Sequence, residues 1–163
     1  GSISINGNIT VNELDRTQLL ISWDDDTIPT NTNLNSPSGR NNQGSVDFII
    51  DPGKFNPASN KTAGLRLLLL SAINTSSNVG VAGYDGPDAW KNADNSDFVA
   101  GENDIVEWDG TQWHIVFDAS TDDGTTTKYI TNLNTGVQYR WTGTEWILSW
   151  EGEYQKGTWR LAL

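Results

Sequence analysis

An internal repeat of a short aromatic segment constrains this chain more than any other feature. The segment VEWDGTQWHIVF begins at Val106, and the similar segment YRWTGTEWILSW begins at Tyr139. Within them the pattern Trp-x-Gly-Thr-x-Trp starts at Trp108 and starts again 33 residues later at Trp141. In each copy a Gly-Thr turn separates two short runs of alternating apolar and polar residues, which is typical of a β-hairpin. The repeat therefore predicts two similar aromatic hairpins.

A two-residue turn would gather the aromatic residues of each hairpin on one face of its ribbon. In the first copy Trp108 would then face Thr111, and Val106 would face Trp113. Cross-strand pairs of this kind stabilise a ribbon by about 0.2–1 kcal/mol each. The face would hold Val106, Trp108, Trp113, Ile115 and Phe117 in the first copy and Tyr139, Trp141, Trp146, Leu148 and Trp150 in the second. On this interpretation the repeat is architectural, and the hairpins pack face to face or onto the N-terminal sheet.

Turn signals recur at short intervals through the C-terminal part of the chain. They are Asp-Gly, Asp-Asp-Gly, Asn-Thr-Gly, Thr-Gly and Lys-Gly, and they separate predicted strands near 104–108, 112–118, 126–133, 137–141, 145–150 and 158–163. No stretch is long or periodic enough for a real helix. We therefore expect an all-β fold, an antiparallel sandwich or meander with long irregular loops and little helix.

The N-terminal part alternates buried-strand patterns with loops. QLLISW, VDFII and GLRLLLLSAI have the apolar content of buried strands. Asn6-Gly7-Asn8 is expected to form a three-residue hairpin turn that pairs Ile5 with Ile9. Residues 24–45 contain almost nothing apolar, so they cannot bury enough surface to offset their ordering entropy, and a long mobile loop is expected there.

The chain of 163 residues is expected to form a single β domain. Its N-terminal strands and long loops occupy residues 1–103, and the aromatic hairpin meander occupies residues 104–163. A meander of about 60 residues buries too little surface to be stable alone, so QLLISW, VDFII and GLRLLLL are expected to supply the sheet beneath it. Gly1 and Ser2 resemble the remnant of a cleaved tag, and methionine is absent. We therefore expect a domain cut from a longer protein.

Composition argues against several classes of function. A net charge of −11 with only ten Lys and Arg residues argues against nucleic-acid binding. No apolar run approaches the roughly 20 residues that span a bilayer, so no membrane partner is expected. Without cysteine there is no thiol nucleophile. The one histidine, His114, is expected at a surface or edge position opposite the tryptophans, so we expect no catalytic residues, no cofactor and no metal.

Acidic residues offer the main rival to that view. Carboxylate pairs such as those of glycosidases occur at Glu102/Asp104, Glu107/Asp109 and Glu151/Glu153. Nothing in their spacing places two carboxylates across a cleft. The acidic segments 24–26 and 121–125 could ligate calcium, but neither matches the loop pattern of calcium-binding hands, so turn formation and solubility are the expected roles. The chain is therefore expected not to be an enzyme.

The second copy resembles a hairpin of a known family. GVQYRWTGTEWILS is similar to the Tyr-turn-Gly-Glu-Trp hairpin of the phage fibritin trimerisation domain, with Tyr139, Gly143, Glu145, Trp146 and Ile147 at matching positions. This copy has one residue more between Gly143 and Trp146, and no short helix follows. ENDIVEWDGTQWHIVFDAS and EGEYQKGTWRLAL resemble β-rich virion modules of T4-like tailed bacteriophages. The resemblance implies a structural or assembly module of a virion neck, tail or fibre, whose partners are other virion subunits, copies of itself included.

The alternative is a carbohydrate-binding module, secreted or at a cell surface, in which tryptophans stack on sugar rings. Such a platform needs exposed aromatic side chains flanked by Asp, Asn or Gln, and this chain has both kinds of residue. Its partner would be a glycan. The candidate interface or ligand platform comprises Trp108, Trp113, Tyr139, Trp141, Trp146 and Trp150.

Overall fold

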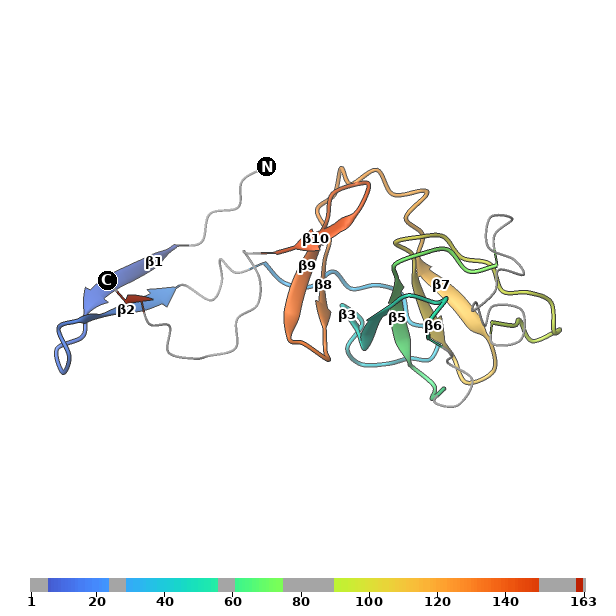
Figure 1. Ribbon diagram of the computed structural model, residues 1–163, viewed down its shortest axis with the longest axis horizontal. Helices are drawn as coiled ribbons and strands as arrows, with labels where there is room; N and C mark the ends of the chain where they lie inside the picture. The colour runs from blue at the N-terminus through green and yellow to red at the C-terminus, as the bar shows by residue number, and fades with distance from the viewer. Residues whose placement is uncertain (1–5, 24–28, 56–60, 75–89, 150–160, 163) are drawn as a thin grey trace.

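The computed structural model describes residues 6–23, 29–55, 61–74, 90–149 and 161–162. These residues form strands and no helix, so the fold is all-β, as predicted. Within this part of the chain there is accordingly no helix that could cross a membrane. The strands form three sheets, which we name A, B and C (Figure 1).

Each sheet combines segments that are far apart in the sequence. Sheet A has the order β1-β2-β11, with β1 (Gly7–Val11), β2 (Gln18–Trp23) and β11 (Leu161–Ala162). Sheet B has the order β10-β9-β8-β3, with β10 (Trp146–Leu148), β9 (Val137–Trp141), β8 (Tyr129–Asn132) and β3 (Ser45–Val46). Sheet C has the order β4-β5-β6-β7, with β4 (Phe48–Ile50), β5 (Arg66–Leu69), β6 (Ile105–Trp108) and β7 (Trp113–Phe117).

Sheets B and C pack on each other through a shared hydrophobic core. Alternate residues of a strand point to opposite faces, and the apolar residues that sheet B turns inward meet those of one face of sheet C. This core, which we call the intersheet core, comprises Leu34, Val46, Leu68, Ile105, Phe117, Ile130 and Trp141. The packing is that of a β-sandwich.

The opposite face of sheet C is covered by loops. Leu65, Leu67 and Leu69 lie on this face, because they alternate with Leu68 of the intersheet core. The loop segment from 90 to 100 closes over them with Trp90 and other apolar side chains. We call the result the loop-covered core, and its buried members are Ile50, Leu65, Leu67, Leu69, Ile73, Trp90, Phe98, Ala100, Val106 and Trp113.

Two strand pairs are parallel, whereas the sequence predicted an antiparallel arrangement throughout. β3 pairs with β8, and β4 pairs with β5, both in parallel. The two short strands belong to one segment that passes from sheet B to sheet C at Asp47.

Both aromatic hairpins have four-residue turns, so the prediction of two-residue turns was wrong. Trp108 pairs with Trp113, and Trp141 pairs with Trp146. The predicted face of the second hairpin is confirmed for Tyr139, Trp141, Trp146 and Leu148, while Trp150 lies outside the described residues. In the first hairpin the register shifts between Ile105 and Val106, so Phe117 points to the opposite face from Trp113.

The N-terminal hairpin differs from the prediction. Gly7 and Asn8 lie within β1, where they pair with Trp23 and Ser22, so they do not form a turn. Ile9 pairs with Ile21, because the alternating apolar residues of β2 supply its partner. The actual turn follows Val11 and is closed by a hydrogen bond from the Asn12 amide to the Gln18 carbonyl, 3.0 Å long.

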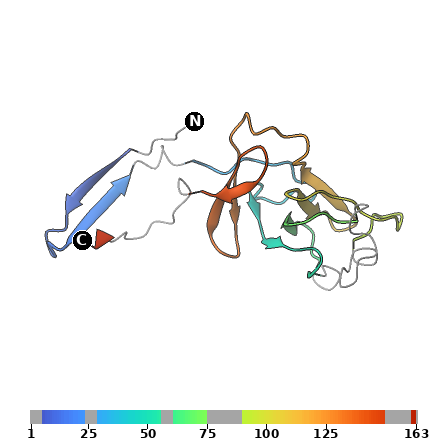
Figure 2. The same cartoon turned by 45° about the horizontal axis from the view of Figure 1, so that its top comes forward.

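Sheet A lies at one end of the molecule, with sheet B between it and sheet C (Figures 1 and 2). Neither core includes a residue of β1 or β2. The expectation that QLLISW would lie beneath the aromatic hairpins is therefore wrong, whereas VDFII and GLRLLLL do contribute to the cores. Whether residues 1–163 unfold as one unit stays a prediction.

Candidate functional site

The two copies of the repeat build the same turn with different capping side chains. In the first, the Asp109 carboxylate accepts hydrogen bonds from the amides of Thr111 and Gln112, at 2.7 and 2.9 Å. In the second, the Thr142 hydroxyl takes that role toward the amides two and three residues on, at 3.3 and 3.1 Å. Gly110 and Gly143 follow the cap with φ angles of 112° and 97°. The repeat is thus a Trp–Trp pair closed by a capped turn.

The Trp108–Trp113 pair lies in the core on one face of sheet C, and the Trp141–Trp146 pair of sheet B lies in the core on its other face. Of the two predicted arrangements, the face-to-face packing of the hairpins is therefore wrong. Trp113 belongs to the loop-covered core, where its ring lies 4.9 Å from that of Trp90 and 5.4 Å from that of Trp108. Trp141 belongs to the intersheet core, where its ring lies 5.3 Å from that of Trp146. Each pair therefore anchors a different core.

The described residues of the predicted ligand platform fall into a buried group and a half-buried group. Trp113 and Trp141 are each 3% exposed, so their rings serve as core and offer no surface to a ligand. Trp108, Tyr139 and Trp146 are half-buried. Lys61 covers the Trp108 ring, with its ammonium 4.1 Å from the ring centroid, and the Trp146 indole donates to the Asn103 carbonyl. Trp150 lies outside the described residues.

His114 lies on β7, an edge strand of sheet C, as predicted. Its Nε2 atom is 2.7 Å from Asp109 Oδ2. Hydrogen bonds from the Gln112 amide, from His114 and from Thr111 hold the pKa of Asp109 well below its usual range. The His114–Asp109 contact joins the hairpin turn to its return strand, so the role of this pair is to stabilise the turn.

Glu107 forms a buried ion pair with Arg66. Both side chains are fully buried, and the guanidinium of Arg66 donates twice to Glu107 Oε2, once at 2.9 Å from Nε and once from Nη2. The other oxygen, Oε1, accepts from the hydroxyls of Ser36 and Ser38 at 2.8 and 2.6 Å and from the Ser38 amide. Burial alone would raise the pKa of Glu107, but the hydrogen bonds from Ser38, Arg66 and Ser36 outweigh it, so the pKa is lowered.

This pair fixes the loop that sequence reasoning treated as mobile. Residues 29–44 contain no strand, as expected, but Leu34 is part of the intersheet core, and Arg66 donates to the carbonyls of Asn35 and Gln43. The loop is therefore ordered both by these polar contacts and by the burial of Leu34. Residues 24–28 lie outside the described residues. A charged residue inside the apolar run LRLLLL was the signal that could have revealed the contact.

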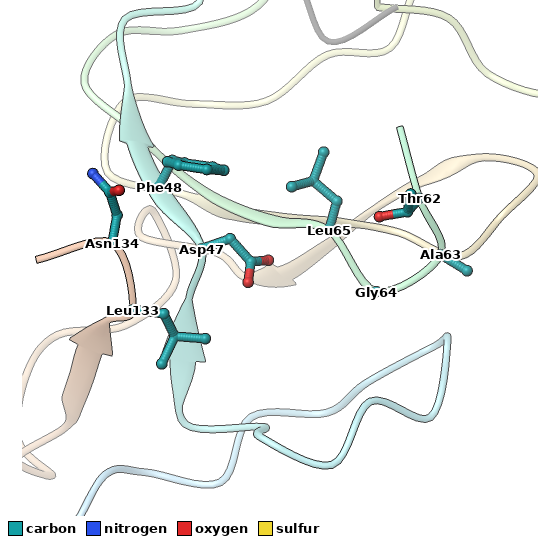
Figure 3. A pocket seen from close by; sticks show the side chains of 8 residues that line it. All are labelled: Asp47, Phe48, Thr62, Ala63, Gly64, Leu65, Leu133 and Asn134. Carbon is teal, nitrogen blue, oxygen red and sulfur yellow. The ribbon is translucent and has the colours of Figure 1, made fainter. Parts of the chain in front are cut away.

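An open groove lies where sheets B and C adjoin (Figure 3). Its volume is about 530 Å³, and its lining residues are Asp47, Phe48, Thr62, Ala63, Gly64, Leu65, Leu133 and Asn134. Figure 3 shows the Asp47 side chain between the Phe48 ring and Leu133, facing the turn that carries Gly64 and Leu65. The sequence analysis placed some of these residues in predicted strands but assigned a binding role to none of them.

A second groove, of about 540 Å³, contains the acidic pair Glu102 and Asp104. Asp104 is 3% exposed, and its two carboxylate oxygens accept the amides of Ala119 and Gly101 at 2.8 and 2.7 Å. Burial raises the pKa of Asp104, although these two hydrogen bonds act against that rise. Asp104 thus fastens two loops to each other, and its oxygens are already occupied.

The remaining acidic candidates are placed as follows. In the segment 121–125, Asp122 pairs with Lys128, and Asp123 caps its own turn by accepting the Thr125 amide at 2.9 Å. Across the part of the chain that the structure describes, no group of three or more acidic or histidine side chains could hold a metal. Residues 24–26, Glu151 and Glu153 lie outside that part.

Sheet A carries an exposed apolar face. Directly paired residues share a face, so Ile9 and Ile21 lie together, as do Val11 and Leu19. Ile9 is 66% exposed and Val11 is 53% exposed, and every residue of β1 is exposed. The opposite face carries Asn8, Thr10, Leu20 and Ser22.

Comparison with known proteins finds no family model, no curated protein and no solved structure that matches the chain.

Proposed function

We propose that this chain is a non-enzymatic structural module that assembles with further copies of itself in a virion neck, tail or fibre. The virion setting rests on the sequence resemblance of the hairpins to tailed-phage modules. The assembly role is carried by one observation, the exposed apolar face of sheet A. The module would act as a rigid β scaffold that presents this face to a neighbour.

The composition of sheet A supports a role as a contact surface. β1 and β2 contain no charged residue, although the chain as a whole carries a net charge of −11. Natural edge strands that stay unpaired are usually protected by Lys, Pro or a bulge, and β1 has none of these. A three-stranded sheet gains stability by covering its hydrophobic face. The face is therefore suited to burial.

A second copy of the chain is the partner that fits this face best. An apolar, uncharged face matches its own image under a twofold rotation, which is the usual geometry of a self-associating surface. Elsewhere two copies would repel each other because both are strongly acidic. From strand dimensions the face measures roughly 20 Å by 14 Å, well below the 800 Å² per partner of a typical stable interface. Association should therefore be weak for an isolated pair and strong only among many copies.

The charged residues of sheet C and its turns support the non-enzymatic part of the proposal. Glu107 is neutralised by Arg66, and Asp109 is occupied by its turn and by His114. The hydrogen bonds and ion pair that hold each carboxylate would have to break before that carboxylate could act on a substrate.

Sedimentation velocity over a range of concentrations tests the proposal. The unaltered chain should self-associate, and added salt should strengthen association because it screens the repulsion between acidic copies. Ile9→Glu should remain monomeric. Thr10→Glu places the same charge on the opposite face of the same strand and should associate like the unaltered chain. A monomer at every concentration and salt level, or equal behaviour of the two variants, would refute the proposal.

A further inference from the structure

The groove in Figure 3 combines an exposed aromatic ring with polar groups that have unused hydrogen-bonding capacity. Phe48 is 41% exposed and Leu133 is 46% exposed, although both are large apolar side chains. Within the described part of the chain, neither the Thr62 hydroxyl nor the Asn134 amide makes a side-chain hydrogen bond. The groove is therefore amphipathic, with exposed apolar side chains and free polar groups along the same lining.

Asp47 is held in a fixed orientation at the centre of the groove. Its Oδ2 atom accepts from Arg40 Nη1 at 2.9 Å and from the Arg66 amide at 2.7 Å. Its Oδ1 atom accepts only a long bond, 3.4 Å, from Arg40 Nη2 among the described residues. A carboxylate oxygen can accept two hydrogen bonds, so Oδ1 can still receive a donor from a ligand without any rearrangement.

Arg40 does not offer a site for an anion. Its Nε donates to the Asn42 carbonyl, Nη1 donates to Asp47 and to the Gly64 carbonyl, and Nη2 donates to Ser45 and to Asp47. These bonds occupy all five donors of a guanidinium. Phosphate and sulfate groups therefore find no free cation at this point, and the acidic chain as a whole repels them.

These features suit a neutral ligand with a flat apolar face and several hydroxyl groups. The C–H face of a pyranose ring packs on an aromatic ring such as that of Phe48, while its hydroxyls can donate to Asp47 and exchange hydrogen bonds with Asn134 and Thr62. The volume of about 530 Å³ lies in the range of small-molecule sites. The open shape suits a chain of sugars that continues beyond the groove.

We propose that this groove binds a short neutral oligosaccharide, with one pyranose ring stacked on Phe48 and its hydroxyls bonded to Asp47 and Asn134. This site differs from the tryptophan platform that the sequence suggested, because Trp113 and Trp141 are buried and none of the described tryptophans lines the groove. It is also independent of the self-association of sheet A. A protein can carry both functions or either one.

Titration of the ¹⁵N-labelled full chain with trisaccharides of glucose, mannose, galactose and N-acetylglucosamine tests the site. At millimolar concentrations one of these sugars should shift the amide resonances of Ala63, Gly64 and Asn134. Phe48→Tyr keeps a ring and should keep binding. Phe48→Leu keeps an apolar side chain without a ring and should weaken binding at least about fivefold, as loss of an aromatic contact does.

Two further variants keep the result unambiguous. Asn134→Ala should weaken binding, and its exposed side chain makes no hydrogen bond within the described structure, so folding should be unaffected. Val99→Ala alters the second groove, where Val99 is 52% exposed, and should bind like the unaltered chain. The proposal is overturned if no sugar shifts the groove resonances, if Phe48→Leu binds equally well, or if the shifts centre on Trp108 and Trp146 instead.

Discussion

Gly124 and Gly143 lie backbone to backbone. A Cβ atom on Gly124 would lie 2.5 Å from the Gly143 nitrogen, and one on Gly143 would lie 2.4 Å from the Asp123 carbonyl oxygen. Beside this contact the Trp141 indole donates to the Asp122 carbonyl at 3.1 Å. The loop between β7 and β8 is therefore pressed against the turn of the second hairpin. Gly110, the equivalent residue of the first hairpin, meets only Ala63 Cβ, at 3.5 Å.

Gly143 and Gly110 therefore allow a controlled comparison, because they occupy equivalent positions and only Gly143 lies against another backbone segment. Gly143→Ala and Gly110→Ala should both lose about 1–2 kcal/mol of stability, because both positions have positive φ angles. Gly143→Ala should lose a further 1–3 kcal/mol or so, since its methyl group overlaps a backbone carbonyl that cannot rotate away. Denaturant unfolding measures both values. Equal losses would show that the close contact is absent in solution.

Trp113 tests the architectural interpretation of the repeat. Trp113→Ala should cost about 3–5 kcal/mol, because it removes a buried ring that contacts Trp90 and Trp108. Trp113→Phe should cost much less, since the Trp113 indole N–H is buried and makes no hydrogen bond that Phe would lose. Thermal unfolding gives both values. If Trp113→Ala stays soluble with an unchanged melting temperature, Trp113 is not core and the tryptophan platform regains support.

The contribution of Asp109 to folding stability should depend on pH in the acid range. Its pKa is lowered in the folded state, so its stabilisation is complete above the unfolded-state value of about 3.9 and is lost as pH falls through the folded-state pKa. Asp109→Thr copies the cap that Thr142 provides in the second hairpin and removes the titrating group. The unaltered chain should be the more stable of the two at neutral pH, and its advantage should shrink on acidification below about pH 4.

The measurement is chemical unfolding at a series of pH values. Thr142→Ala serves as a control, because it removes a cap that does not titrate, and its deficit should not change over the same range. An advantage of Asp109 over Thr that is constant with pH would contradict the assignment.

The ion pair of Arg66 and Glu107 should behave non-additively. Glu107→Leu or Arg66→Met alone leaves an unpaired buried charge and should cost about 3–5 kcal/mol. The double variant removes both charges and should recover part of that loss. It should not recover all of it, because Ser36 and Ser38 also lose their acceptor. A double-mutant cycle measures the coupling, and simple additivity of the two losses would mean that the residues do not interact.

Residues 104–163 alone should not fold. They lack β3, β4 and β5, so β6 would keep only β7 as a neighbour in sheet C, and β8 would keep only β9 in sheet B. Near-ultraviolet dichroism of this fragment should show no native signal and heating should show no sharp transition. A cooperative transition would mean that the hairpin meander is an independent domain.

Sequence patterns predicted the local features of the fold and missed those that depend on distant partners. The turn at Gly143 and the shared face of Trp141 and Trp146 follow from alternation within a few residues. The bulge that turns Phe117 away from Trp113 leaves no local signature. The two-residue strand β3 is too short for any periodicity.

The candidate sites illustrate the same limit. The aromatic set was recognisable, but its burial depends on loop segments such as that of Trp90, whose course no local pattern indicates. The groove combines residues from three separate segments around Asp47, Thr62 and Asn134. Only a fold brings such residues together, so their sequence neighbourhoods gave no sign of a site.

The pairing of Leu161 with Leu19 has a consequence for how the chain is made. β1 and β2 leave the ribosome well before β11, the third strand of their sheet, because all the strands of sheets B and C lie between them in the sequence. Until then the open edge of β2 is available to the nascent chains of neighbouring ribosomes. Sheet C can form much earlier, because its last strand ends at Phe117. Sheets B and C should therefore be able to fold before sheet A, which is completed only when β11 pairs with β2.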